Sequence, residues 1–376
     1  MKAIIIGGGI GGLAAAIGLR NAGADAEVFE RAEPFGEVGA GITLWPNAVK
    51  ALQQLGLVEA IRAISVLEAQ GGIRTWRGAL LSSASTADIE RAFGAPTLVM
   101  HRAELHDVLL QALGSERVQL GAQCVGFEQD DRSVAAIFAD GRRVHGDLLI
   151  GADGLRSVVR AQLHGEQPPR YAGYTAWRAV VPFSRNRVLP GETWGMGARF
   201  GQVPLSDDRI YWFATKNALP GERSPDGEKA ELLRRFRGWH VPIEAVIGAT
   251  PADAILRHDI YDRPPLRRWG AGRVTLLGDA AHPMTPNLGQ GACQAIEDAV
   301  VLMKQVSAGG AVAGVLRAYE AERMQRTAWL VAQSRRIGAV GQWHNPLGVA
   351  VRDMLIKVLG ARLQERQLVR VIGHEV

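Results

Sequence analysis

The segment Gly7-Gly8-Gly9-Ile10-Gly11-Gly12 has the spacing Gly-x-Gly-x-x-Gly and stands between a short apolar run and an alanine-rich helical pattern. The run is typical of a buried strand, and the periodic segment after it is typical of a helix. In such a turn Gly7 permits a tight bend, Gly9 lets the backbone approach a pyrophosphate, and Gly12 lets the helix pack closely on the strand. The segment therefore predicts a strand, a turn and a helix whose N-terminus faces an anion.

A second apolar pair, Val28-Phe29, follows a helix stop at 21–24 and completes a βαβ unit, which predicts a parallel sheet. Glu30 ends this strand at the spacing expected of a carboxylate that hydrogen-bonds an adenosine ribose, and we place the adjacent Arg31 in the same site. These features predict dinucleotide binding. They do not distinguish FAD from NAD.

The remaining pattern predicts a mixed α/β protein. Helical patterns cover 46–63 and 102–112, and strand-like runs cover 117–130 and 134–150, with a hairpin turn at Asp140-Gly141. Between 166 and 270 aromatic and polar stretches alternate, which is typical of an antiparallel sheet. The chain then returns to the first domain through a strand at 273–277 and a helix at 290–306, and two long covering helices over 313–372 are separated near Asn345-Pro346.

We therefore divide the chain into three parts. A discontinuous nucleotide-binding domain comprises 1–70, 96–165 and 270–340. A second domain comprises 71–95 and 166–269, and residues 341–376 form a C-terminal helical segment.

Composition excludes several classes of function. The 376 residues carry a net charge of +5 without a basic run, so we expect no nucleic-acid partner. Cys124 and Cys293 lie outside any metal-binding spacing, so we expect neither a metal site nor a disulfide. The apolar start breaks at Gly7 without a cleavage pattern, and no segment reaches the roughly 20 apolar residues of a membrane helix. We expect a soluble, cytoplasmic protein.

Two further motifs follow predicted strands. Asp153, in Gly151-Ala152-Asp153-Gly154, starts a helix, and an ordinary turn with a helix cap is the alternative to a binding role. Asp279 ends the strand at 273–277, where its carboxylate could bind the ribityl hydroxyls of a flavin or, alternatively, cap a helix. His282 follows in the same turn, and we interpret it as structural rather than as an acid–base group.

The segment after His282 exposes bare backbone at a helix start. Gly289 and Gly291 precede and open the predicted helix, so its free N–H groups could approach a ligand closely. A reduced isoalloxazine is anionic near N1, and a helix N-terminus aimed there would favour the reduced state.

Together, the glycine turn with Glu30, the Asp153 segment and the Gly278-Asp279 segment resemble the class A flavoprotein monooxygenases over about 1–340. The chain looks most similar to the group that includes salicylate hydroxylase, FAD-dependent urate hydroxylase and the zeaxanthin epoxidase catalytic region. This resemblance implies a Rossmann-like FAD-binding domain with a parallel sheet, an antiparallel-sheet substrate domain and C-terminal covering helices.

The resemblance also implies roles for individual residues. Gly39-Ala40-Gly41 matches the loop over the flavin, Arg102 matches an arginine that contacts FAD, and Val125 matches a position that packs on the adenine. A solvated cation at a helix start is the alternative for Arg102. The expected cofactor-binding residues are Gly7, Gly9, Gly12, Glu30, Arg31, Gly41, Arg102, Val125, Asp153, Asp279, Pro286, Gly289, Gly291 and Ala292.

The reaction implied by the resemblance is hydroxylation. NADPH or NADH reduces the FAD, dioxygen adds at the flavin C4a position, and the hydroperoxide transfers one oxygen atom to a small aromatic or N-heteroaromatic substrate. The chain has one glycine fingerprint, so the nicotinamide donor would bind transiently in the cleft between domains. We expect a monomer or homodimer.

Arg199 and Tyr211 match the substrate-side arginine and tyrosine of FAD-dependent urate hydroxylase, and we assign them as catalytic. An arginine over the flavin would stabilise an anionic substrate, and a tyrosine hydroxyl would orient its polar edge. The alternatives are a surface cation for Arg199 and a half-buried strand aromatic for Tyr211. We expect the neighbouring Phe213 to fill core.

The sequence leaves several different activities open. A flavin-dependent halogenase would be expected to carry a Trp-x-Trp-x-x-Ile-Pro segment, which this sequence lacks. A reductase on the same fold, an epoxidase of an isoprenoid-type substrate and a non-catalytic flavin-binding redox sensor each stay compatible with the cofactor motifs.

Overall fold

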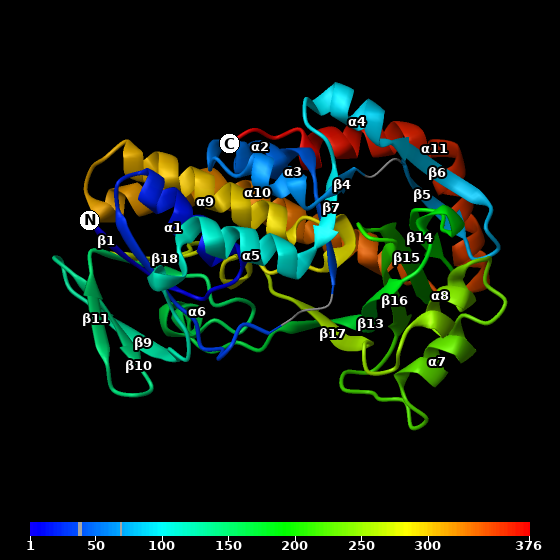
Figure 1. The fold of residues 1–376 in the computed structure, drawn as a ribbon, viewed down its shortest axis with the longest axis horizontal. Helices are drawn as coiled ribbons and strands as arrows, with labels where there is room; N and C mark the ends of the chain where they lie inside the picture. The colour runs from blue at the N-terminus through cyan, green and yellow to red at the C-terminus, as the bar shows by residue number, and fades with distance from the viewer. Residues whose placement is uncertain (37–39, 68–69) are drawn as a thin grey trace.

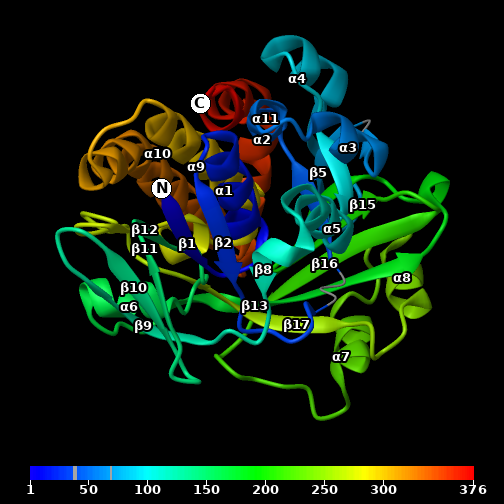
Figure 2. The same cartoon turned by 60° about the vertical axis from the view of Figure 1, so that its left-hand side comes forward.

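A computed structural model describes residues 1–36, 40–67 and 70–376, with the backbone alone for 70, 84 and 359–367. The ribbon has two sheet regions, with the nucleotide-binding motif in one and the strands after residue 166 in the other, and long helices extend across the top (Figure 1). The second view shows α11 on the outer side of the helical layer (Figure 2).

The first sheet is parallel, as the glycine turn predicts. Its order is β18-β12-β1-β2-β8, and all four neighbouring pairs run in the same direction. The late strand β18 lies beside β12, which confirms that the chain returns to the first sheet after residue 270. The strands are β1 (Lys2–Ile6), β2 (Asp25–Phe29), β8 (Val118–Gln119), β12 (Leu148–Gly151) and β18 (Val274–Leu276).

Helices α1 (Ile10–Asn21) and α9 (Gly291–Ser307) pack against each other next to this sheet. Small residues allow this close approach, since a Cβ on Gly18 would lie 3.1 Å from the Ala299 carbonyl oxygen. Gly12 has the role expected of it, because a Cβ there would lie 1.9 Å from the Gly7 carbonyl oxygen. The glycines of the turn and of α1 thus allow the N-termini of α1 and α9 to lie at one edge of the parallel sheet.

A small antiparallel sheet, β11-β10-β9, packs against the parallel one. It comprises β9 (Cys124–Gln129), β10 (Val134–Phe138) and β11 (Arg143–Gly146). Asp140-Gly141 forms the predicted turn between β10 and β11, with Gly141 at a φ of 85°. A second small sheet, β3-β7-β4, comprises β3 (Gly41–Leu44), β4 (Val66–Leu67) and β7 (Leu98–His101).

The large sheet has seven strands in the order β17-β13-β16-β15-β14-β5-β6. The strands between 166 and 270 pair antiparallel, as expected, whereas β5, from an earlier part of the chain, pairs with β14 in parallel. Strands joined by a tight hairpin must be antiparallel, whereas β5 reaches this sheet from a distant part of the chain and is free of that constraint. The strands are β5 (Gln70–Thr75), β6 (Leu80–Ser85), β13 (Arg170–Pro182), β14 (Gly191–Trp194), β15 (Ala198–Pro204), β16 (Arg209–Asn217) and β17 (Leu256–Asp262).

The helical pattern at 46–63 forms two helices, since Gly56 adopts a φ of 78° between them. The two long C-terminal helices are separated near Asn345-Pro346, as expected. The remaining helices are α2 (Pro46–Gln54), α3 (Val58–Ala63), α4 (Thr86–Phe93), α5 (Arg102–Leu113), α6 (Val158–His164), α7 (Glu228–Arg235), α8 (Ile243–Ala249), α10 (Val312–Gly341) and α11 (Pro346–Ile372).

The two sheet regions have separate hydrophobic cores. One surrounds the parallel sheet and helices α1 and α9, and the other contains Trp177, Phe200, Trp212 and Phe236 on one side of the large sheet. These separate cores support the division into 1–70, 96–165 and 270–340 against 71–95 and 166–269, which stays our proposal.

Candidate functional site

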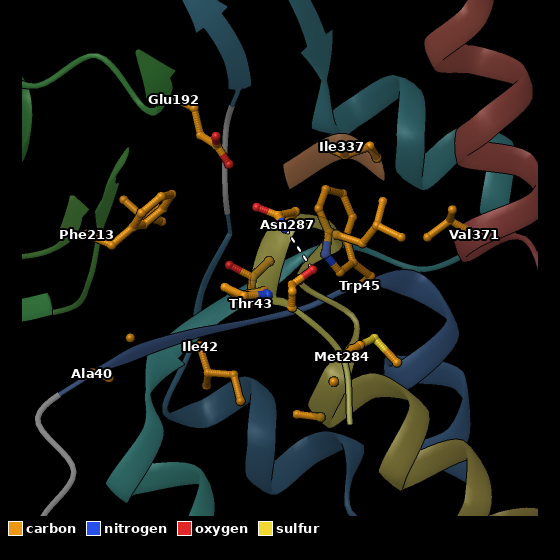
Figure 3. A pocket seen from close by; sticks show the side chains of 18 of the residues that line it. Ala40, Ile42, Thr43, Trp45, Glu192, Phe213, Met284, Asn287, Ile337 and Val371 are labelled. Atoms are coloured by element: carbon orange, nitrogen blue, oxygen red, sulfur yellow. Dashed lines mark hydrogen bonds between the residues drawn. The ribbon is translucent and has the colours of Figure 1, made fainter. Parts of the chain in front are cut away.

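A cavity of about 860 Å³ opens where the parallel sheet, the large sheet and the C-terminal helices meet. Figure 3 shows side chains from several of these elements around it. Most of the predicted site residues line it: Gly9, Gly41, Arg102, Arg199, Tyr211, Asp279, Pro286, Gly289, Gly291 and Ala292.

Two helix N-termini face this cavity without a side-chain cap. Gly9 is the N-cap of α1, Gln290 is the N-cap of α9, and neither helix has an acidic residue in its first turn. A Cβ added to Gly9 or to Gly291 would meet no atom within 4 Å, so bare backbone borders the open space. Unsatisfied N–H groups and the positive ends of two helix dipoles favour an anionic ligand.

Gly7 and Gly12 lie buried beneath the α1 terminus and shape the turn rather than line the cavity. Gly7 has a φ of 111°, and a Cβ on it would lie 2.4 Å from the Ala152 carbonyl oxygen. Only glycine fits such a position. The structure therefore supports the packing roles of these two glycines.

Glu30 follows β2 and lies half-buried beside the glycine turn. Its Oε2 accepts a hydrogen bond from the Gly8 N–H at 2.7 Å, and its Oε1 accepts one from the Ala32 N–H at 2.9 Å. Each carboxylate oxygen can accept a further bond, so the group remains able to bind ribose hydroxyls. Arg31 and Val125 are exposed and lie outside the cavity lining, and Gly39 lies outside the described residues.

Arg102 and Asp279 both line the cavity and attract each other. Arg102 begins α5, and burial lowers its pKa while the attraction of Asp279 opposes that change. Burial likewise raises the pKa of Asp279, against the attraction of His282 and Arg102. Arg102 is thus not a solvated cation, and the pair offers a donor and an acceptor to a ligand.

Asp153 caps helix α6. This agrees with the alternative that we gave for its motif, an ordinary turn with a helix cap. Its Oδ2 accepts the Val158 N–H at 2.7 Å at the start of α6, where Ser157 is the N-cap. Its Oδ1 is buried and has no partner in the described chain. Desolvation raises the pKa of Asp153. Asp153 itself does not line the cavity, although its neighbours Ala152 and Gly154 do.

His282 is structural, as expected. It is 3% exposed, and its Nε2 lies 2.6 Å from Oδ2 of Asp298 on α9. The same Oδ2 accepts the Gly278 N–H at 3.0 Å, and Arg323 of α10 donates to Oδ1 at 2.7 Å. This buried cluster fixes the turn that carries Asp279.

Arg199 is buried in the cavity wall, so its interpretation as a surface cation is wrong. It is 2% exposed, its Nη2 donates to Asn287 Oδ1 at 2.6 Å, and its Nε donates to Gln342 Oε1 at 3.2 Å. Glu192 Oε2 lies 3.6 Å from Nη1. A guanidinium has five N–H donors, so donors remain for a ligand.

Tyr211 lies over the strand that carries Gly41. A Cβ on Gly41 would lie 2.5 Å from Tyr211 Cγ, so this glycine makes room for the ring. Burial raises the pKa of Tyr211 despite Arg178 and Arg102 nearby, which keeps its hydroxyl protonated as a donor. Our expectation that Phe213 fills core is wrong: it is half-buried and lines the cavity, while Trp212 on the opposite face is fully buried.

Sequence reasoning missed several residues of this cavity, among them Asn287, Arg178, Glu192 and Trp45. Asn287 lies in Pro286-Asn287-Leu288, within a motif that we singled out for its glycines. The prolines and glycines around Asn287 were the sequence signal that could have indicated its place in the site. Arg178 and Glu192 carry no local signal, because the pairing of distant strands places them here.

Over 1–36, 40–67 and 70–376 there is no group of His, Cys, Asp and Glu side chains that could hold a metal ion. Within that same part of the chain, no helix is long and apolar enough to cross a membrane.

Uncapped helix N-termini beside a ribose-type acid, with a large cavity against a second sheet, are typical of an enzyme that binds a dinucleotide next to a second ligand. The FAD binding domain family matches residues 1–334, and the chain belongs to this family. It is an FAD-dependent monooxygenase that uses NADPH or NADH as co-substrate.

Similar proteins agree with this assignment. The chain is 46% identical to aurachin C monooxygenase/isomerase of Stigmatella aurantiaca over 96% of this chain and 95% of that protein. It is 39% identical to FAD-dependent urate hydroxylase of Klebsiella oxytoca over 89% of each. The crystal structure of Klebsiella pneumoniae HpxO with FAD and uric acid superposes with a TM-score of 0.93 at 34% identity, covering 99% and 97% of the two chains.

Proposed function

We propose that the enzyme hydroxylates a planar hydroxylated aromatic or N-heteroaromatic ring whose polar or anionic edge lies on Arg199. The burial of Arg199 supports this most directly, because a guanidinium that is 2% exposed lines the cavity, where its partners are Glu192, Asn287 and Gln342. A buried cation with spare donors favours an anionic partner.

The residues of the chain fit FAD in four places. The α1 terminus at Gly9 would take the pyrophosphate, Glu30 the ribose, and Asp279 with Arg102 the ribityl chain and ring. The α9 terminus at Gly291 would stabilise negative charge on the ring. When bound and reduced by NADPH or NADH, FAD supplies the activation of dioxygen.

Arg199 and Tyr211 would act on the substrate. The positive charge of Arg199 lowers the pKa of a substrate hydroxyl or carboxyl and holds the ring in its electron-rich anionic form. Tyr211, protonated at neutral pH, donates a hydrogen bond that orients the polar edge. Phe213 packs beside Tyr211, with ring centroids 6.3 Å apart, and helps to exclude water from the reacting ring.

The names of the relatives do not identify the ring of this enzyme's substrate. The relatives are named for urate, aurachin C and 3-amino-4-hydroxybenzoate, which are different substrates. Epoxidation of an isoprenoid hydrocarbon is disfavoured, since such a substrate offers no polar edge to the Arg199 donors that Glu192, Asn287 and Gln342 leave free. We also propose a cytoplasmic location. We further propose a monomeric or homodimeric state, and gel filtration can check this oligomeric state.

A substrate screen tests the function. Oxygen-dependent oxidation of NADH and of NADPH is measured with aromatic acids, phenols, purines, quinolones and isoprenoids, and products are analysed by mass. We expect a hydroxylated aromatic or N-heteroaromatic acid to stimulate oxidation and to gain one oxygen atom. Stimulation by isoprenoid hydrocarbons alone would contradict the proposal, and absence of any oxygen-dependent turnover would favour a redox sensor.

A further inference from the structure

The cavity has two parts of different chemistry. One part carries all the charged side chains of the lining. Arg178, Glu192 and Arg199 come from the large sheet, and Arg102 and Asp279 are the pair that we assign to FAD. The other part, which we name the apolar arm, is bordered by apolar side chains of α4, α10, α11, the residue before α2 and the segment before α9. Its residues are Trp45, Ile89, Met284, Leu288, Ile337, Leu355, Ile356, Leu368, Val371 and Ile372. Thr86 of α4 and Thr285 of the segment before α9 also line the cavity.

The apolar arm lies beyond Asn287, away from the large sheet. In Figure 3 Trp45, Ile337 and Val371 stand on one side of Asn287, and Phe213 stands on the other. Asn287 also accepts a hydrogen bond from Arg199. A molecule whose polar head reaches Arg199 could therefore extend past Asn287 into the arm.

The side chains around the arm form a hydrophobic cluster of their own. Ile89, Val371 and Ile372 are 6%, 4% and 1% exposed, and Trp45 and Met284 pack against them. They nevertheless border open space. An apolar space that side chains leave unfilled forfeits packing energy, so it is favourable only when an apolar ligand occupies it.

The residues that we assign to FAD are not among those that border the arm, although Trp45 lies beside Gly289, where a Cβ would be 3.0 Å from Trp45 Nε1. The groups that fit FAD, namely Gly9, Arg102, Asp279 and Gly291, lie in the polar part. Leu355, at the α11 side of the arm, is 45% exposed, so the arm approaches the protein surface there. A chain longer than the aromatic head has room to continue in this direction.

We propose that the substrate carries an apolar hydrocarbon chain, which occupies the arm while its aromatic head lies beside Arg199 and Tyr211. This inference rests on the proposed function, because it places the head in the same site. Each methylene that the arm buries should raise affinity roughly fourfold, so affinity rises steeply with chain length.

The test uses the full-length, FAD-loaded protein without NAD(P)H. The probes are two matched series, 2-alkyl-4-hydroxyquinolines and 6-alkylsalicylates, each with methyl, butyl and heptyl chains. Dissociation constants come from the perturbation of the bound flavin spectrum. In the series whose head binds, we expect the heptyl compound to bind at least roughly tenfold more tightly than the methyl compound.

Variants locate the chain. Ile337→Trp fills the arm and should abolish the gain from the longer chain, whereas Ile337→Val should retain it. Leu347→Trp adds the same bulk to an outer position of α11 that is 80% exposed, and should keep the gain. Met284→Trp, from a different element, replaces Ile337→Trp if that variant does not fold.

Each outcome separates this inference from the proposed function. Equal binding of methyl and heptyl compounds, or a chain-length gain that survives both arm-filling variants, overturns the inference and leaves the proposed function intact. Failure of every probe to bind, together with no turnover of any hydroxylated ring, overturns the proposed function and the inference with it.

Discussion

Asn287 accepts a 2.6 Å hydrogen bond from Arg199 through its Oδ1. Asn287 lies in the short segment before α9, and Arg199 lies on β15 of the large sheet. Asn287 Nδ2 also donates to the Ser334 carbonyl oxygen of α10 at 2.9 Å. One amide side chain thus joins the flavin-side helix start, the large sheet and the C-terminal helices, and sets the position of the buried guanidinium.

Arg199→Gln should keep the fold and the bound FAD but weaken substrate binding. A hydrogen bond to a charged group contributes about 1.5–3 kcal/mol, so we expect KM to rise roughly ten- to hundredfold. The substrate would also lose orientation, and NAD(P)H oxidation should release hydrogen peroxide in place of product. Steady-state kinetics with product and peroxide assays measure both effects.

Arg199→Lys is the matched control for charge, because it keeps the cation but loses the two-pronged donor. It should give an intermediate KM. Wild-type KM and coupling in Arg199→Gln with an identified substrate would refute the role of this arginine and favour a more apolar head.

Glu30→Gln should reduce FAD retention roughly tenfold, since a charged acceptor for the ribose becomes neutral. Titration of the apoprotein with FAD measures the affinity, and the protein should prefer FAD to FMN. Glu27→Gln on β2 is the control, because Glu27 pairs with Lys2 at 3.4 Å and does not border the glycine turn. Equal loss of affinity in both variants, or preferential binding of FMN, would contradict the assignment.

Gly291→Val should impair flavin binding at least roughly tenfold with little loss of stability. Valine has a better helix propensity than glycine, and a Cβ here meets no protein atom within 4 Å, so the apoprotein should tolerate it. The side chain would instead occupy space at the helix terminus that faces the cavity. FAD titration and thermal unfolding of the apoprotein separate the two effects.

Gly314→Val on α10 is the comparison, because Gly314 has equally open surroundings and does not line the cavity. It should leave FAD affinity unchanged. If Gly291→Val lowers affinity only in proportion to a loss of folding, this helix start is an ordinary turn.

The parts of the site that depend on local sequence were predictable. Gly9 and Gly12 act through the absence of a side chain within one turn, so their spacing alone carries the information. The burial of Arg199 was not predictable, because its partners Asn287 and Gln342 are 88 and 143 residues away along the chain. Only the assembled fold encloses it.

Strand alternation explains the error at Phe213. The pattern places Tyr211 and Phe213 on one face of β16 and Trp212 on the other, but it does not say which face meets the core. The core covers the Trp212 face, where Phe200 stacks at 5.5 Å. The apolar arm was equally hidden, since α4, α10 and α11 contribute to it from separate stretches of sequence.

Asp298→Asn should destabilise the protein and make its free energy of unfolding depend less on pH in the acid range. Against the cost of burial, His282 and Arg323 lower the pKa of Asp298 to about 2. A carboxylate with a depressed pKa stabilises the fold at pH values above its unfolded pKa, near 4, and that contribution is lost as the pH falls toward 2. The free energy of unfolding should therefore fall between pH 5 and 3 with a slope of up to about 1.4 kcal/mol per pH unit from this group.

Urea unfolding at pH 5, 4 and 3 measures this slope in the wild type and in Asp298→Asn. Asp131→Asn is the control, because Asp131 is an exposed carboxylate, and it should leave most of the slope unchanged. The asparagine at 298 should also loosen the turn held by the Gly278 N–H, so FAD affinity should fall along with stability. An unchanged slope with unchanged FAD affinity would show that Asp298 neither titrates on unfolding nor positions Asp279.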